Sequence, residues 1–123
     1  MTDQNIYTHE FMHYYKNPNH KGRLENPQYI AKTANLSCGD SIELEINTEN
    51  NIVKKCGYNG TGCIVSLGCA ELLAEYVEGK SLDDLSAFSK DNFFDLIGFE
   101  LTFSRQKCAL ISFNALQKII DAK

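Results

Sequence analysis

The sequence predicts an α+β fold, in which a small antiparallel β-sheet of about three strands is covered by several α-helices. Three segments support this fold class. Residues 41–47 alternate between apolar and polar side chains, as a half-buried strand does. Residues 64–77 are apolar almost all round, which indicates a largely buried helix. Residues 105–122 carry apolar side chains at helical spacing, which predicts a second covering helix.

The first forty residues are expected to form one helix and one long loop. Apolar side chains recur at helical spacing over residues 6–16. This helix must end before Pro18, because the residue that precedes a proline is pushed out of the helical region. Residues 19–37 are polar and include Gly22 and Pro27, so they are predicted to be a loop without a strand.

A β-hairpin is predicted next. The strand over 41–47 is followed by the turn residues Glu49-Asn50-Asn51. The chain then returns through residues 52–59, where Ile52, Cys56 and Tyr58 share one face. The hairpin ends shortly before Cys63.

Helices fill the second half of the chain. The helix over 64–77 has few polar positions besides Ser66 and the stripe Glu71, Glu75, Glu78, and Gly79 is a natural stop. Ser81 is expected to cap a short helix. A further helix is expected over 91–97, ending at Gly98. The last helix, 105–122, places on one face Ala109, Phe113, Leu116 and Ile120.

Composition narrows the classes of function. A chain of 123 residues with 43% apolar and 23% charged residues fits one globular domain, 1–123. Its net charge of −4 argues against a nucleic-acid partner. No apolar run approaches the roughly 18 residues that span a membrane, so no membrane partner is expected, and the N-terminus does not resemble a signal peptide. Five cysteines, an odd number, favour free or metal-bound thiols in a reducing compartment, so a cytoplasmic location is expected.

Three cysteines lie in settings that favour a reactive thiolate. Cys38 stands in Ser37-Cys38-Gly39-Asp40, next to a carboxylate. Cys63 follows a glycine-flanked turn and opens an apolar helix, and Cys108 lies beside cations in Arg105-Gln106-Lys107-Cys108. Helix N-termini and neighbouring cations stabilise thiolates. Three thiolates and a carboxylate suit a zinc ion, and equally a small iron–sulfur cluster.

The alternative is that each cysteine is a small buried apolar residue, which is common for free cysteine. This interpretation is preferred for Cys56, which points inward on its strand, and for Cys69, in the most apolar helix. It is weaker for Cys38 and Cys63, whose glycine neighbours expose backbone N–H groups. Asp40 is open to two interpretations, since Gly-Asp is also a common turn dipeptide.

A second pattern points to a different chemistry. His9-Glu10-Phe11-Met12-His13 matches HExxH, the zinc-protease helix motif. The motif is short, and His20 is the one later histidine that could complete a site. Surface histidines on an amphipathic helix explain the pattern better, so a protease is not expected.

Several segments together resemble the U-type iron–sulfur cluster assembly scaffolds, the family of IscU, the NifU N-terminal domain and SufU-like proteins. The resemblance runs from about Tyr7 to the last helix. The segments that carry it are Asn17-Pro18-Asn19-His20-Lys21-Gly22, Cys38-Gly39-Asp40, Gly62-Cys63, Gly79-Lys80-Ser81 and Arg105-Gln106-Lys107-Cys108.

The resemblance implies the IscU/NifU-like fold and an assembly site formed by Cys38, Asp40, Cys63 and Cys108. Such scaffolds are not enzymes in the strict sense. They accept sulfur as persulfide from a pyridoxal-phosphate (PLP)-dependent cysteine desulfurase, bind iron, assemble a transient 2Fe–2S cluster and transfer it to apo iron–sulfur proteins. A carboxylate in place of a fourth thiolate makes a more exchangeable ligand set, and the same set would hold Zn²⁺.

Three details of the resemblance affect the function expected. Lys107 stands where many scaffolds carry histidine, as in SufU-like members, which implies an alternative role as a zinc-dependent sulfur acceptor; a structural zinc domain is a third possibility. The Leu-Pro-Pro-Val-Lys segment that a dedicated Hsp70 chaperone reads is replaced by Leu101-Thr102-Phe103-Ser104-Arg105, so chaperone-driven release is doubtful. Cys108 is expected to receive persulfide first, because the sequence places it in the first turn of the last helix beside Arg105 and Lys107.

Overall fold

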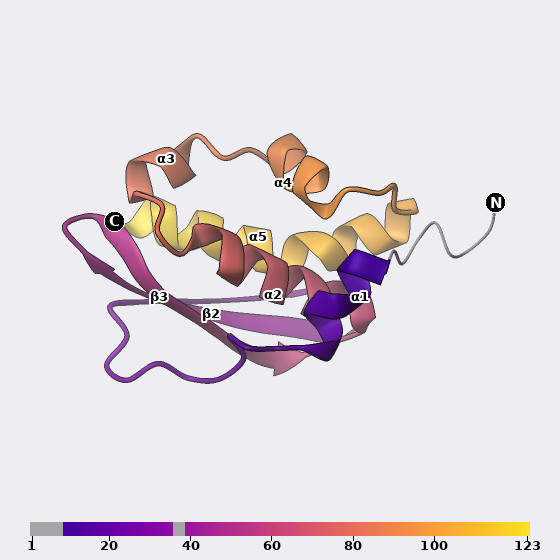
Figure 1. Ribbon diagram of the computed structural model, residues 1–123, viewed down its shortest axis with the longest axis horizontal. Coiled ribbons are helices and arrows are strands. Elements are labelled where there is room, and N and C mark those ends of the chain that lie inside the picture. The colour runs from indigo at the N-terminus through magenta and orange to yellow at the C-terminus, as the bar shows by residue number, and fades with distance from the viewer. Residues whose placement is uncertain (1–8, 36–38) are drawn as a thin grey trace.

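The computed structural model describes residues 9–35 and 39–123, and in them a three-stranded antiparallel sheet lies under helices. Figure 1 shows α2 and α5 across one face of the sheet, with α3 and α4 beyond them. The α+β fold class is confirmed. The elements are α1 His9–Lys16, β1 Tyr29–Asn35, β2 Asp40–Glu49, β3 Ile52–Thr61, α2 Ile64–Val77, α3 Leu82–Ser86, α4 Lys90–Ile97 and α5 Phe103–Ala122.

The predicted hairpin is confirmed as β2 and β3, which pair antiparallel at the centre and one edge of the sheet. Ile42, Leu44 and Ile46 of β2 are fully buried, as the alternation predicts, and belong to the core. Asn50 and Asn51 both adopt left-handed backbone angles, φ 56° and 67°. Two such residues make the tight turn whose twist suits a hairpin.

The predicted loop over 19–37 is wrong in part, because it contains the edge strand β1, paired antiparallel with β2. Its strand signal is weak for a physical reason. Its central inward-facing residues, Ala31 and Thr33, are small, whereas Ile30 points outward and is 53% exposed. Tyr29, at the start of the strand, packs against the core. Thr33 also donates its hydroxyl hydrogen bond to the Ile111 carbonyl of α5, which ties β1 to that helix.

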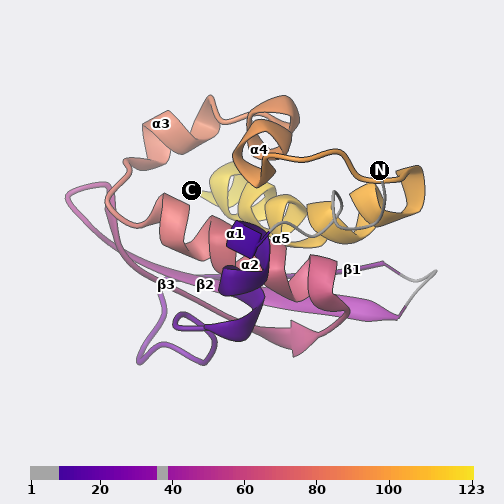
Figure 2. The ribbon, with the colours of Figure 1, turned by 45° about the vertical axis from the view of Figure 1, so that its right-hand side comes forward.

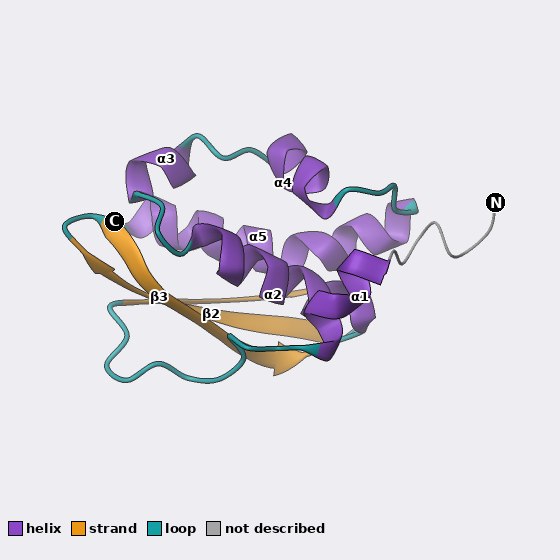
Figure 3. Ribbon diagram, in the orientation of Figure 1, coloured by secondary structure: helices purple, strands orange, loops and turns teal. Residues whose placement is uncertain are grey.

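The polar segment that precedes β1 first runs along the edge of β3 and then crosses the other face of the sheet, the side away from α2 and α5 (Figure 3). Glu45 of β2 points to this side but is only 1% exposed. Its carboxylate accepts hydrogen bonds from the Leu24 N–H, at 2.7 Å, and from the Arg23 guanidinium. The segment is therefore an ordered cover held to the sheet by a buried charge.

The charged stripe of α2 contains a buried member, which the sequence did not predict. Glu71 is 1% exposed and accepts hydrogen bonds from the His20 backbone N–H, at 2.9 Å, and from the Tyr58 hydroxyl, at 3.1 Å. The His20 ring lies between two carboxylates, with Nδ1 2.5 Å from Glu71 and Nε2 3.1 Å from Glu78. This cluster fastens the covering segment to α2 and β3.

The helix predictions are largely confirmed. Helix α2 has the predicted bounds, Ser81 caps α3, and Gly98 ends α4 in a left-handed conformation. Helix α1 ends before Pro18 as expected. Helix α5 begins at Phe103, two residues earlier than predicted. None of the described helices is long and apolar enough to cross a membrane.

Candidate metal centre

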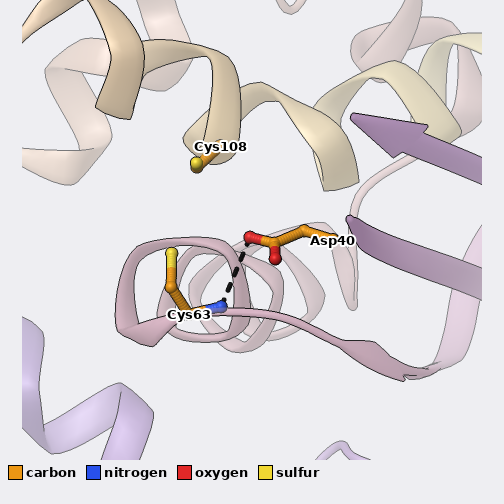
Figure 4. A group of neighbouring side chains, drawn as sticks. All are labelled: Asp40, Cys63 and Cys108. Carbon is orange, nitrogen blue, oxygen red and sulfur yellow. Dashed lines mark hydrogen bonds between the residues drawn. The ribbon is translucent and has the colours of Figure 1, made fainter. Parts of the chain in front are cut away.

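Three of the four predicted ligands meet at one end of the molecule. Asp40 begins β2, Cys63 lies at the junction of β3 and α2, and Cys108 lies in α5 (Figure 4). One ligand atom from each lies within 4.8 Å of the others. Figure 2 shows the first turns of α5 on the same side of the molecule as the end of β1 and the start of β2. Cys38, two residues before Asp40, lies outside the described residues.

Two glycines shape the backbone on either side of the site. Gly39 has φ 77°, and its N–H donates to the Asn35 carbonyl at 2.9 Å, which closes the connection from β1 to Asp40. Gly62 precedes Cys63 where β3 turns into α2. A Cβ at this position would lie 2.0 Å from the Ser66 hydroxyl oxygen, so a side chain there must displace that hydroxyl. The site therefore depends on both glycines, on Gly39 for its left-handed backbone angle and on Gly62 for the absence of a side chain.

Asp40 is held by the N-terminus of α2. Asp40 as a whole residue is 8% exposed, and its Oδ2 accepts hydrogen bonds from the Cys63 N–H, at 3.3 Å, and the Ser66 hydroxyl, at 3.0 Å. The positive end of a helix dipole also favours an anion at this place. Cys63 is the N-cap of α2, but its side chain makes no capping hydrogen bond, so its thiol can serve as a ligand.

Cys108 lies deeper in its helix than the sequence predicts. Because α5 begins at Phe103 and is capped by Thr102, Cys108 falls in the second turn of the helix rather than in the first. The effect of the helix dipole declines beyond the first turn. Cys108 is also buried, at 8% exposed, whereas Cys63 is half-buried at a true helix N-terminus. The helix-dipole argument therefore applies to Cys63 more strongly than to Cys108.

An open cavity of about 550 Å³ adjoins the ligands. Arg105 and Lys107 contribute to its wall, as the sequence suggests for cations near Cys108. Phe103, 73% exposed, lies at its rim, with the Lys107 ammonium 4.9 Å from the centre of its ring. The lining residues are Asn35, Asp40, Cys63, Phe103, Ser104, Arg105, Lys107 and Cys108.

The other two cysteines are buried core residues, as predicted. Cys56 is 2% exposed and Cys69 is fully buried. Burial, and then the charges of Cys63 and Cys108, raise the pKa of Cys69. Burial and then Glu78 and Glu71 raise the pKa of Cys56. Both therefore stay protonated thiols at neutral pH, unsuited to bind a metal.

The described histidines do not join the candidate centre. His13 is exposed and its ring is 3.2 Å from the Asn17 side-chain amide, whereas His20 is held by Glu71 and Glu78. Within the described part of the chain, the group of histidine, cysteine and acidic side chains close enough to share one ion is Asp40, Cys63 and Cys108. The side chain of His9 lies outside that part, so the case against the HExxH interpretation stays a prediction.

The donor set fits a single tetrahedral ion. Zinc bonds to sulfur at about 2.3 Å and to oxygen at about 2.0–2.2 Å, which puts neighbouring ligand atoms roughly 3.3–3.8 Å apart. The ligand atoms here lie within 4.8 Å of one another, so modest side-chain rotations bring them to that spacing. Two cysteine thiolates and a carboxylate leave one position of a tetrahedron, and Cys38 as its ligand stays a prediction.

Ser66 is the residue of this centre that the sequence did not single out. It appears in the sequence only as a polar interruption of an apolar helix. A small hydroxyl residue one helical turn after a candidate ligand at a helix N-terminus would have been a usable signal. Residues three apart share one face of a helix, so such a hydroxyl reaches back to the cap.

Comparisons with known proteins show the family to which this chain belongs. The sequence model of the NifU-like N-terminal domain matches residues 6–122. The chain is 30% identical to the zinc-dependent sulfurtransferase SufU of Bacillus subtilis, over 92% of this chain and 88% of that protein. It is 25% identical to the iron–sulfur cluster assembly scaffold protein IscU of Haemophilus influenzae, over 93% and 92% respectively.

A solved structure shares the fold. It is described as a putative scaffold protein for the SUF system from Fervidobacterium islandicum, with a TM-score of 0.80, 22% identity, and coverage of 97% of this chain and 99% of that one. This likeness confirms the IscU/NifU-like fold. Since the family match extends over nearly the whole sequence, this chain belongs to the NifU-like N-terminal domain family.

Proposed function

We propose that this protein accepts sulfur from a PLP-dependent cysteine desulfurase for iron–sulfur cluster assembly, and that its resting site holds one zinc ion between Cys38, Asp40, Cys63 and Cys108. The observation that carries the proposal is the convergence of three ligand atoms within 4.8 Å of one another. A 2Fe–2S cluster distributes its ligands over two iron atoms, whereas so compact a set suits a single ion.

The chemical step is a transfer of sulfane sulfur. A site thiolate attacks the terminal sulfur of the persulfide on the desulfurase. A new S–S bond forms on this chain, the S–S bond of the donor breaks, and the donor cysteine leaves as a thiolate. No electrons are gained or lost overall, so the step needs no oxidant or reductant.

The described residues support three parts of this step. When bound, zinc would keep its cysteine ligands as thiolates. Asp40 is the ligand that can leave most readily, because a carboxylate binds zinc less strongly than a thiolate does. Arg105 and Lys107 line the same cavity, where their charges favour an incoming anionic persulfide. We propose Cys108 as its acceptor, with Cys38 and Cys63 as the rivals.

The cavity argues against a purely structural zinc domain. A purely structural zinc site needs no access for a partner, because its ligands only hold the ion and stabilise the fold. Here the ligands border an open cavity of about 550 Å³. A partner's persulfide-bearing loop could reach the thiols through it. We propose a cytoplasmic location, where the thiols stay reduced.

A second candidate function is assembly of a transient 2Fe–2S cluster at the same residues, followed by transfer to apo iron–sulfur proteins. The carboxylate of Asp40 favours it, since a cluster that must leave benefits from one exchangeable oxygen ligand. A zinc-loaded resting state is compatible with this role only if iron can displace zinc during assembly.

One experiment separates these functions. The protein is purified anaerobically, its metal content is measured, and it is incubated with a cysteine desulfurase and cysteine, with and without ferrous iron. Mass spectrometry of the peptides then locates added sulfur, and absorbance reports a cluster. Cys69→Ala is the matched control, because Cys69 is a buried thiol behind the site.

We expect one zinc per chain and added sulfur without iron. Colour that develops only with iron, on protein that holds no zinc, would instead support the 2Fe–2S scaffold. Tightly held zinc with no sulfur transfer would favour the structural domain and overturn both proposals.

A further inference from the structure

Ser66 is a fully buried polar residue that contacts two candidate ligands. It lies in the first turn of α2 and is 0% exposed. Its hydroxyl oxygen is 3.0 Å from Asp40 Oδ2, 3.2 Å from the Cys63 carbonyl oxygen and 3.8 Å from Cys63 Sγ. A hydroxyl has one proton to donate, so these three acceptors compete for it.

The carboxylate of Asp40 wins this competition. It is the nearest of the three acceptors, and it is charged, which roughly doubles the strength of a hydrogen bond. The Cys63 N–H donates to the same carboxylate oxygen at 3.3 Å. Two donors from the start of α2 therefore fix the orientation of the Asp40 side chain.

We infer that Ser66 is a positioning residue for the metal centre, which holds Asp40 in the orientation that lets it bind the ion. The inference rests on the metal-binding part of the proposed function. Partners of this kind behind a metal ligand typically contribute 10–100-fold to metal affinity.

Gly62 leaves the space that the Ser66 hydroxyl occupies in this contact, because glycine has no Cβ. A Cβ at Gly62 would lie 2.0 Å from the Ser66 hydroxyl oxygen and 3.3 Å from Asp40 Cγ. An alanine there must displace the hydroxyl from its present place. Gly62→Ala therefore disturbs the same hydrogen bond without deleting the group that makes it.

The chain offers a matched control on the neighbouring helix. Ser112 of α5 is also 0% exposed, but its hydroxyl has no hydrogen-bond partner among the described residues. Ser112→Ala removes the same atom from an equally buried place that holds no ligand. A nonspecific effect on zinc affinity of replacing a buried serine would appear in both variants.

The test measures zinc affinity by competition with a coloured chelator, in wild type, Ser66→Ala, Asp40→Ala, the double variant, Gly62→Ala and Ser112→Ala. Circular dichroism verifies that each is folded. The visible spectrum of the cobalt-substituted protein reports ligand geometry independently of sulfur transfer. We expect Ser66→Ala and Gly62→Ala to weaken zinc binding about 10–100-fold and to alter the cobalt spectrum. Ser112→Ala should do neither.

The double variant decides whether Ser66 acts through Asp40. We expect Ser66→Ala to cost less than about twofold once Asp40 is alanine, because the remaining contact to Cys63 Sγ is long. An equal loss in both backgrounds would overturn the inference, as would wild-type affinity in Ser66→Ala. If Asp40→Ala itself binds zinc as wild type does, the proposed centre fails, a result distinct from failure of Ser66 alone.

Discussion

Replacing His20 should destabilise the fold in a way that depends on pH. The His20 ring is 18% exposed and lies between Glu71, which is buried, and Glu78, which is one third exposed. Burial alone would lower the pKa of His20, but the hydrogen bonds and charges of Glu71 and Glu78 outweigh it, so the pKa is raised above 6.5. The protonated ring is thus favoured by folding.

The magnitude follows from the two contacts of the ring. Hydrogen bonds between charged groups contribute about 1.5–3 kcal/mol each where they are buried, as at Glu71. The contact to Glu78 is more exposed and is worth about 1 kcal/mol or less. Glu71 would keep two donors, the His20 N–H and the Tyr58 hydroxyl. His20→Ala should therefore cost about 3 kcal/mol in the free energy of unfolding at acidic pH.

The direction of the pH dependence follows from the raised pKa. A group whose pKa is higher in the folded than in the unfolded protein stabilises fully below the unfolded value, and this contribution is lost as pH rises through the folded pKa. The difference in the free energy of unfolding between wild type and His20→Ala should be largest near about pH 5.5. It should be roughly half as large near about pH 9, because the neutral ring keeps only part of its hydrogen bonding.

Urea unfolding of both proteins at these two pH values measures the difference. His13→Ala is the control, because His13 is exposed and should change the free energy of unfolding by less than about 0.5 kcal/mol. A His20→Ala protein as stable as wild type near pH 5.5, or equally destabilised at both pH values, would refute the reasoning.

Three further predictions concern the histidines of α1, the buried Ser112 and the bound metal ion. His9→Ala combined with His13→Ala should leave the zinc content unchanged, and loss of one zinc per chain would restore the HExxH interpretation. Ser112→Ala should raise the free energy of unfolding by about 1 kcal/mol, because it removes a buried hydroxyl that has no partner among the described residues. A variant less stable than wild type in urea unfolding would contradict this. Removing zinc with a chelator should lower the melting temperature, since an ion present at about 100 times its Kd stabilises by about 2.7 kcal/mol. An unchanged melting curve would contradict a bound ion.

The parts of the fold that could be predicted are those with a local signal. The alternation of β2 and the apolar run of α2 can each be recognised within a short stretch of sequence. The capping residues Ser81 and Gly98 can be recognised from their immediate neighbours. Strand β1 could not be predicted because its central inward residues, Ala31 and Thr33, are small and Ile30 faces outward. Its place in the sheet depends on pairing with β2, which is not local.

The candidate site shows the same division. Asp40, Cys63 and Cys108 are recognisable as ligand types, and the structure brings their ligand atoms together. Neither the hydrogen bond from Ser66 to Asp40 nor the burial of Glu71 against His20 could be predicted from spacing. Both join residues that are distant in the sequence, so only the packing of α2 against its neighbours reveals them.

The identity of the sulfur acceptor turns on which charges activate the thiol. Lys107 and Arg105 share a cavity with Cys108, whereas Cys63 has the N-terminus of α2. If the cations decide, brief desulfurase treatment should add sulfur to the peptide that contains Cys108. Lys107→Glu should then slow transfer several-fold at low salt and less at high salt, because exposed charges are screened. Lys118→Glu, near the other end of the same helix, is the matched control and should leave the rate unchanged.

Sulfur on Cys63, with no effect of Lys107→Glu, would show instead that the helix terminus activates the acceptor. If sulfur is found on Cys38 and still appears there in the Cys108→Ser variant, Cys38 is the acceptor and Cys108 serves only as a metal ligand.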